Sequence, residues 1–244
     1  MKSLHVFLAI LGLWLALPNS SSAAFIATGP AVPINAIPGG ALTVGDKQFS
    51  NFALDGFAFN GAIPPTPSQL LVQAGTDSVT GMYGLRFSMA YFVTANQILD
   101  AILTFQVSVI PPTSNLRITG TTLTLSAPSV GGPGSFITIG ESVFATSSTA
   151  TAPVANLGVS ATPGGNPADQ FETKTFANTP LQTAYIRKDI LLFGGSSGVT
   201  HMSEFFQFYE QTAIIPEPSL IGMGIIGGLG SCWMLKRRKK TLTA

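Results

Sequence analysis

The sequence predicts an all-β protein, an antiparallel β-sandwich of the jelly-roll or Greek-key kind, and three observations support this. Apolar and polar residues alternate over two long stretches, which is the period of a strand with one buried face. The 26 glycines and 17 prolines gather in clusters such as IPPTP, GGPG and TPGGNP, which favour turns. No stretch of about twelve residues has a helical apolar period free of breakers. A closed barrel is the alternative architecture.

The clearest strands are expected at Gly84–Val93 and Ala101–Val109, where every second residue is apolar. Alternation of this kind indicates antiparallel sheets with one covered face, because parallel strands are usually apolar on both faces. Weaker strands are expected at Ala41–Val44, Phe49–Phe59, Leu70–Val72, Leu116–Leu125, Phe136–Ile139, Gln182–Phe193 and Phe205–Tyr209. The segment Ser142–Pro167 is rich in small residues and almost uncharged, and it predicts a surface excursion or a linker.

The charge of the chain is weak and unevenly distributed. The whole chain has a formal net charge of +1, yet between Phe25 and Ile215 there are 6 basic and 10 acidic residues, a balance of 6 − 10 = −4. A slightly acidic body with scattered cations lacks the basic patch that nucleic-acid binding requires. We therefore expect no nucleic acid among the partners.

The N-terminus has the pattern of a secretory signal peptide. Lys2 precedes an apolar run from Val6 to Leu17, and small residues follow Pro18 up to Ala24. The alternative is a membrane anchor, but the run is short for crossing a bilayer, which needs about 20 residues. Residues 1–24 are therefore predicted to be a signal peptide cleaved after Ala24, and residues 25–212 to be the β-sandwich body.

The C-terminal tail, residues 213–244, has three parts in a fixed order. A proline–acid–proline motif comes first, then an uncharged apolar segment from Leu220 to Leu235, then a basic cluster. The motif is Pro216, Glu217, Pro218 and Ser219, and the cluster is Lys236, Arg237, Arg238, Lys239 and Lys240. The apolar segment predicts a single transmembrane helix, and the basic cluster predicts that its end stays cytoplasmic. A plain single-pass anchor is the alternative.

This tail resembles the PEP-CTERM sorting domain of exported proteins in Gram-negative bacteria. The resemblance covers about thirty residues, and Ile215 stands where that family often has valine. It implies that an exosortase recognises Pro216, Glu217 and Pro218, and that the basic cluster acts as a retention signal. It also implies export across the inner membrane, an unprocessed form anchored there, and delivery to the cell surface or the extracellular space.

The body also resembles bodies that precede this tail, through GDKQFSNFAL (Gly45–Leu54) and GLRFS (Gly84–Ser88). This likeness implies no known activity. The family context links such proteins to exopolysaccharide and biofilm, so we expect a non-enzymatic surface or matrix protein. A carbohydrate-binding module with the same tail is the alternative, and it predicts exposed aromatic residues clustered on one sheet face.

A secreted hydrolase is a further, weaker alternative. Residues Gly194–Gly198 match G-x-S-x-G, which in hydrolases presents a nucleophilic serine between a strand and a helix. The residues after Gly198 are β-branched and aromatic, a poor helix start, and His201 is only five residues from Ser196. A glycine–serine hairpin turn is the preferred interpretation, and no catalytic residue is predicted.

No metal site or cofactor is predicted. His201 is the single histidine of the predicted body, and one histidine cannot supply the three or four ligands of a zinc site. Asp46, Asp55, Asp77 and Asp100 lack the close spacing of a calcium loop, so they are interpreted as solvated loop acids. The single cysteine, Cys232, lies in the tail, so the body has neither a disulfide nor a thiol nucleophile.

Overall fold

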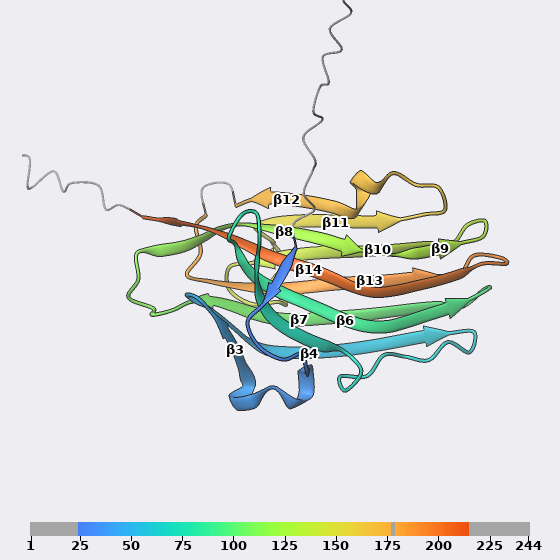
Figure 1. The fold of residues 1–244 in the computed structure, drawn as a ribbon, viewed down its shortest axis with the longest axis horizontal. Helices are drawn as coiled ribbons and strands as arrows, with labels where there is room; N and C mark the ends of the chain where they lie inside the picture. Colours follow the sequence, from blue (N-terminus) through green and yellow to red (C-terminus); the bar gives the residue numbers. More distant parts are fainter. Residues whose placement is uncertain (1–23, 177–178, 215–244) are drawn as a thin grey trace, which may run out of the picture.

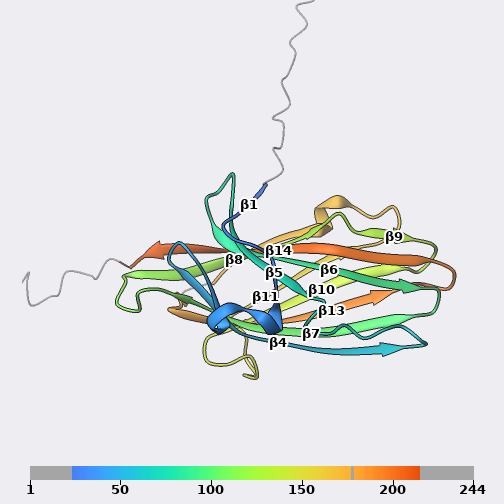
Figure 2. The ribbon, with the colours of Figure 1, turned by 60° about the horizontal axis from the view of Figure 1, so that its bottom comes forward.

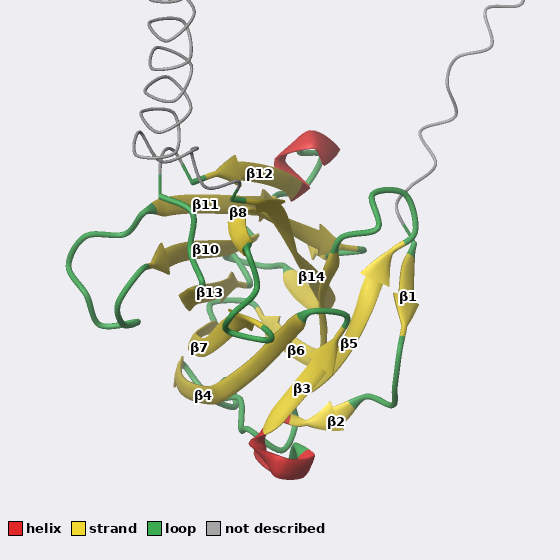
Figure 3. Cartoon of the chain, turned by 90° about the vertical axis from the view of Figure 1, so that its left-hand side faces the viewer, coloured by secondary structure: helices red, strands yellow, loops and turns green. Residues whose placement is uncertain are grey.

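A computed structural model describes residues 24–176 and 179–214 of the chain. Two antiparallel sheets pack face to face in it, and Figure 3, which looks along the strands, shows the two layers. The predicted all-β class and antiparallel pairing are confirmed. The finer jelly-roll assignment remains a prediction. The sorting motif, apolar segment and basic cluster lie outside the described residues, and so does the predicted signal peptide except for its last residue, Ala24.

The first sheet, sheet A, has eight strands. Its main order is β1 (Phe25–Ala27), β5 (Leu71–Asp77), β6 (Tyr83–Thr94), β14 (Val199–Ala213), β8 (Leu116–Ser126) and β12 (Phe171–Thr175). The short strand β2 (Val32–Pro33) pairs with β5, and β9 (Ser129–Gly131) pairs with β14. The long strand β14 therefore lies inside the sheet, between two partners far from it in the sequence (Figure 1).

The second sheet, sheet B, has six strands. Its order is β11 (Ala155–Ala161), β10 (Phe136–Phe144), β13 (Thr183–Phe193), β7 (Ile98–Val109), β4 (Lys47–Phe59) and β3 (Ala41–Val44). Short 3₁₀ turns occur at Ile34–Ala36, Pro38–Gly40 and Pro167–Gln170. Most connections cross from one sheet to the other, so neighbours within a sheet are seldom consecutive in the chain (Figure 2).

The core lies between the two sheets and follows from the alternation in the sequence. In β6 the inward positions run from Leu85 to Val93 at every second residue, and all of them are buried. The inward positions of β7 are buried in the same way. Phe87 of sheet A contacts Phe105 of sheet B with ring centroids 5.5 Å apart. Each such side chain contributes about 2 kcal/mol through removal of its apolar surface from water.

Several predicted elements need correction. The segment Ser142–Pro167 is not an excursion throughout, because it includes the end of β10 and all of β11. Its small residues hid β11, which is held by seven cross-strand pairs with β10. The strand expected at Phe205–Tyr209 extends to the 15 residues of β14, since it has pairing partners on both sides. Within the described residues no helix is long and apolar enough to cross a membrane.

Candidate functional site

A row of aromatic and polar side chains crosses the outer face of sheet A. Phe206 of β14 is paired with Arg86 of β6 on one side and with Thr124 of β8 on the other. Thr124 is in turn paired with Phe171 of the edge strand β12. Phe171 is 57% exposed, which is unusual for so large an apolar side chain. The row therefore has an exposed ring at its edge and a second ring two strands further in.

A second row runs beside the first and carries hydroxyl groups. Phe208 of β14 is paired with Thr122 of β8, which is paired with Thr173 of β12. The hydroxyls of Thr122 and Thr173 are hydrogen-bonded at 2.9 Å. Threonines thus occupy the strand that separates the inner aromatic rings from Phe171.

A pair of glycines lets the N-terminal strand complete the aromatic wall. Gly75 of β5 and Gly84 of β6 are directly paired, and neither places a side chain on the sheet. A Cβ on Gly75 would lie 2.3 Å from the ring of Phe25. The ring of Phe25 therefore lies across this gap and stacks on Phe206, with centroids 5.6 Å apart and planes at 30°. The guanidinium of Arg86 lies 5.6 Å from the centre of the Phe25 ring.

These elements enclose a groove of about 520 Å³, called the aromatic groove below. It is lined by Ala24, Phe25, Asp77, Thr122, Thr124, Leu125, Ser126, Ala127, Phe171, Phe206 and Phe208. Ala24 is the last residue of the predicted signal peptide, so after the predicted cleavage the lining would begin at Phe25. The Oγ of Ser126 donates to Glu204 Oε1 at 3.1 Å, and Glu204 lies 4.0 Å from Arg86. Aromatic walls with hydroxyls between them can hold a ring that has apolar faces and polar edges.

The groove as a unit is not predicted by the sequence. Exposed aromatic residues on one sheet face were expected only as the consequence of an alternative function, and no groove residue was predicted to bind a ligand. The usable signal was FFQF within β14, because residues of both parities are aromatic there and one parity must face outward. Nothing in the sequence indicates that Phe25 contributes to the groove, because this depends on Gly75 lying beside its ring in the fold.

The Gly194–Gly198 motif forms a turn, but it is not a hairpin. It joins β13 in sheet B to β14 in sheet A, so the flanking strands belong to different layers. No helix follows Ser196, and among the described residues no hydrogen bond joins Ser196 to His201. His201 lies within β14, paired with Phe92 and Ser129. The arrangement lacks the strand–turn–helix elbow that this motif needs for nucleophilic catalysis.

The aspartates have structural roles that partly correct the prediction. Asp77 is not solvated but buried, and its Oδ1 accepts hydrogen bonds from the Val79 and Thr80 amides at 2.7 and 3.0 Å. Asp100 is part of β7, and its pKa is raised by partial burial and by the neighbouring Asp189. Across the part of the chain that the structure describes, no three His, Cys, Asp or Glu side chains group as metal ligands.

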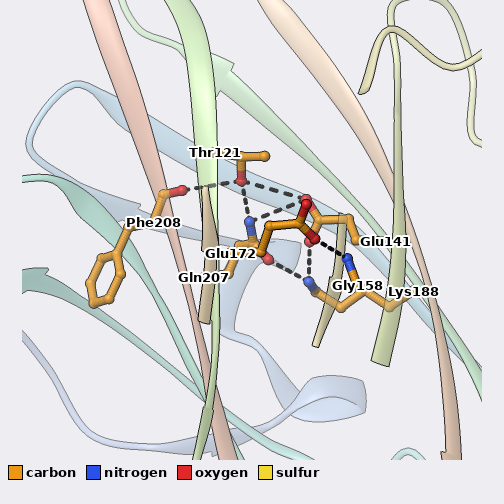
Figure 4. Close-up of polar contacts among 7 residues, drawn as sticks. All are labelled: Thr121, Glu141, Gly158, Glu172, Lys188, Gln207 and Phe208. Carbon is orange, nitrogen blue, oxygen red and sulfur yellow. Dashed lines mark hydrogen bonds and ion pairs between the residues drawn. The ribbon is translucent and has the colours of Figure 1, made fainter. Parts of the chain in front are cut away.

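A buried polar cluster lies between the sheets, and we call it the Lys188 centre (Figure 4). Lys188 of β13 and Glu141 of β10 are directly paired in sheet B, and both side chains are fully buried. The Nζ of Lys188 donates to Glu141 Oε2 and to the side-chain Oε1 of Gln207, which comes from β14 of sheet A. Thr121 of β8 accepts from Gln207 Nε2 and donates to the Phe208 carbonyl at 3.1 Å.

A second lysine, Lys47 at the start of β4, has similar partners. Its Nζ donates to Asp46 Oδ1 at 2.8 Å and to the side-chain Oε1 of Gln211 on β14. Lys47 is inaccessible to solvent, whereas Asp46 is 17% exposed. We call this group the Lys47 centre. Lys47 and Lys188 were interpreted from the sequence as scattered cations of the body. The structure corrects that interpretation, because both side chains are buried in polar clusters.

Comparison with known proteins adds little about function. No family model matches the chain, and no curated protein matches it. The chain is similar to a solved carbohydrate-binding module, TmCBM61 in complex with β-1,4-galactotriose, at 13% identity and a TM-score of 0.27. That similarity covers 65% of this chain and 88% of the module.

The chain is also similar to the enzymatically active domain of tailspike protein 4 of bacteriophage CBA120. There the identity is 12% and the TM-score 0.28, over 66% of this chain and 20% of the other. Similarities at this level indicate neither a ligand nor an activity for this chain.

Proposed function

We propose that the chain is an exported, non-enzymatic surface protein whose body binds a neutral polysaccharide in the aromatic groove. The observation that carries the binding proposal is the outer face of sheet A, where Phe25, Phe206 and Phe171 flank a strand of threonines. Sugar rings have apolar faces that suit aromatic walls, and hydroxyl edges that suit threonine and serine side chains.

The charge around the groove favours an uncharged ligand. Arg86 and Glu204 lie 4.0 Å apart beside the groove, so they neutralise each other. Asp77 is the other acid at the groove, and its Oδ1 is already occupied by two backbone amides. A strongly acidic or basic polymer would find no uncompensated counter-charge here.

The route to the surface is the second part of the proposal. The N-terminal pattern supports export, and the motif Pro216–Ser219 with its apolar and basic segments supports recognition by an exosortase. The unprocessed form would be held in the inner membrane by the apolar segment. Processing would then release the body to the cell surface or the matrix, where exopolysaccharide is present.

Affinity electrophoresis against a panel of neutral polysaccharides tests the binding part. Phe171→Ala should weaken retardation by about tenfold in apparent affinity, which corresponds to about 1.4 kcal/mol. Phe59→Ala is the matched control, because Phe59 on β4 is 56% exposed and lies outside the groove. Equal retardation of both variants, or no retardation of the unaltered protein by any polymer, contradicts the proposal.

Intact mass in cells with and without their exosortase tests the sorting part. Loss of residues 1–24 is expected in both strains, and loss of the tail near Pro218 is expected only when the enzyme is present. A mature form that keeps Leu220 to Ala244 in both strains would show an ordinary membrane anchor instead.

A further inference from the structure

The Lys188 centre places a primary amine against two acyl groups in a site without solvent access. Lys188 and Glu141 have fully buried side chains, and Gln207 is also fully buried. The aromatic ring of Phe205 lies 5.3 Å from the Lys188 Nζ and closes one side of the site. A buried lysine whose amine contacts a carboxamide and a carboxylate holds the three groups needed to form an amide bond.

We infer that Lys188 and Gln207 join in an intramolecular isopeptide bond, which links sheet B to sheet A covalently and releases ammonia. Glu141 would carry the proton from the amine to the leaving group. This modification is independent of the proposed polysaccharide binding, because the two sites lie on opposite faces of sheet A.

The hydrogen bonds arrange nucleophile, electrophile and proton carrier in a closed ring. Lys188 Nζ contacts Gln207 Oε1, so the amine lies beside the Cδ that bears this oxygen. Lys188 Nζ also contacts Glu141 Oε2. The leaving nitrogen, Gln207 Nε2, donates to Glu141 Oε1 at 3.2 Å. One oxygen of the carboxylate therefore faces the amine, and the other faces the group that must depart (Figure 4).

The environment favours the reactive form of the amine. Burial lowers the pKa of Lys188, and the nearby Glu141 charge opposes this shift without reversing it. In a site of low dielectric constant, transfer of a proton from the ammonium to the carboxylate removes two buried charges. The products of that transfer are a neutral amine with a free lone pair and a carboxylic acid.

The step balances without any further reactant. The lone pair of Nζ attacks Cδ of Gln207, and a C–N bond forms. The acid form of Glu141 gives its proton to Nε2 and takes one from Nζ, the Cδ–Nε2 bond breaks, and neutral ammonia leaves. Counted from the neutral amine and the carboxylic acid, Glu141 ends the step as the acid again, and nothing is oxidised or reduced. Close and fixed placement of the reacting groups replaces the concentration that such an aminolysis would need in solution.

The Lys47 centre provides an internal contrast. Lys47 Nζ also contacts a glutamine oxygen and a carboxylate, but no hydrogen bond among the described residues joins Asp46 to Gln211 Nε2. Gln211 is exposed, so water can compete there. Without a carboxylate that reaches both the amine and the leaving group, we expect no bond at Lys47. The protein should therefore lose one ammonia and not two.

High-resolution intact mass of the purified, fully unfolded protein tests the inference, with its termini mapped by peptide sequencing. The expected mass is lower than the sequence mass by one ammonia, and digestion should yield a branched peptide that joins Lys188 to Gln207. Glu141→Gln should restore the full mass, whereas Lys47→Arg should leave the loss of ammonia unchanged.

Three results would overturn the inference, and each is readable on the unaltered protein even if a variant fails to fold. The first is the full sequence mass. The second is a loss of water with a branched peptide joining Lys188 to Glu141, which would make the glutamate the electrophile. The third is a loss of ammonia mapped to any other pair of residues.

Discussion

The two buried lysines of this protein each contact an acid and a glutamine, but these partners differ in their exposure to solvent, and that difference separates the chemistry of the two sites. Lys188 and Lys47 each contact an acid and a glutamine of β14, and the glutamines are Gln207 and Gln211. At the Lys188 centre both members of the ion pair are fully buried. At the Lys47 centre the acid is partly exposed, and the glutamine is exposed.

The comparison shows that the cost of burying a charge depends on where its partner lies. A charge in the interior that loses its partner remains uncompensated, and this costs several kcal/mol. A charge whose partner reaches water is screened, and the pair contributes little. A lysine, an acid and a glutamine can therefore form a reactive centre between the sheets, and an ordinary polar contact at the start of β4.

The largest expected effect is on stability when the Lys188 ion pair is broken. Glu141→Ala should lower the free energy of unfolding by at least about 3–5 kcal/mol, because it removes the proton carrier that the isopeptide needs and leaves a free Lys188 buried without a counter-charge. Chemical denaturation followed by far-ultraviolet circular dichroism measures this change in the free energy of unfolding. The double change Lys188→Met with Glu141→Leu should recover the part of the loss that comes from the uncompensated charge, because it replaces both charged residues by apolar side chains of similar size. If Glu141→Ala lowered the free energy of unfolding as little as Asp46→Ala is expected to, the contrast between the two centres would be contradicted.

The next effect concerns pH and separates a free Lys188 from a cross-linked one. In Glu141→Gln the amine remains free, and burial lowers its pKa below the 10.5 of an unfolded lysine. The unfolded chain then binds more protons than the folded one, so stability should rise with pH as the pH approaches the unfolded pKa of 10.5. The unaltered protein has no amine at this position if the isopeptide forms, so denaturation midpoints should show a weaker rise. Parallel slopes in the two proteins would argue against the cross-link.

A smaller effect is expected at the Lys47 centre. Asp46→Ala should cost about 1 kcal/mol or less, because the carboxylate is partly exposed and Lys47 keeps its contact with Gln211. The measurement is the same denaturation series at low and high salt, with the smaller change at high salt. A loss of several kcal/mol would show that Lys47 is enclosed as tightly as Lys188.

The smallest effect concerns the ring beside Lys47. The Lys47 Nζ lies 6.0 Å from the centre of the Tyr83 ring, at the limit of a cation–π contact. Tyr83→Leu should therefore change stability by only about 0.5 kcal/mol. Phe205→Leu at the Lys188 centre should cost more, since Phe205 also stacks on Phe87 with centroids 4.8 Å apart. Equal losses in thermal denaturation would remove the distinction between the two rings.

Much of the fold could be predicted because alternation fixes which face of a strand is buried. In β6 and β7 the parity of the apolar residues matches the inward face without exception between Leu85 and Val93 and between Leu99 and Val109. The same rule could have located the Lys188 centre. Lys188 occupies the parity of Ile186 and Ile190 in β13, and a charged residue on an apolar parity indicates a buried polar site.

Other features could not be predicted, because they depend on neighbours distant in the sequence. The pairing of Lys188 with Gln207 requires two strands in different sheets to face each other. The aromatic groove requires Gly75 to lie beside Phe25, because a Cβ there would collide with the ring that stacks on Phe206. Strands β11 and β12 carry small and polar residues, and only pairing with β10 and β8 makes them strands.

The place of β14 also determines how the body would carry mechanical load. It is the last strand before the tail, and its ladder to β6 spans Val199–Tyr209 while its ladder to β8 spans Glu204–Ala213. Its hydrogen bonds run perpendicular to the strand, so tension applied along the strand from Ala213 would shear two ladders at once. An edge strand would instead peel away one bond at a time. If the body is attached through its C-terminal end, the load therefore acts on a strand whose two hydrogen-bonded ladders resist unfolding by shear.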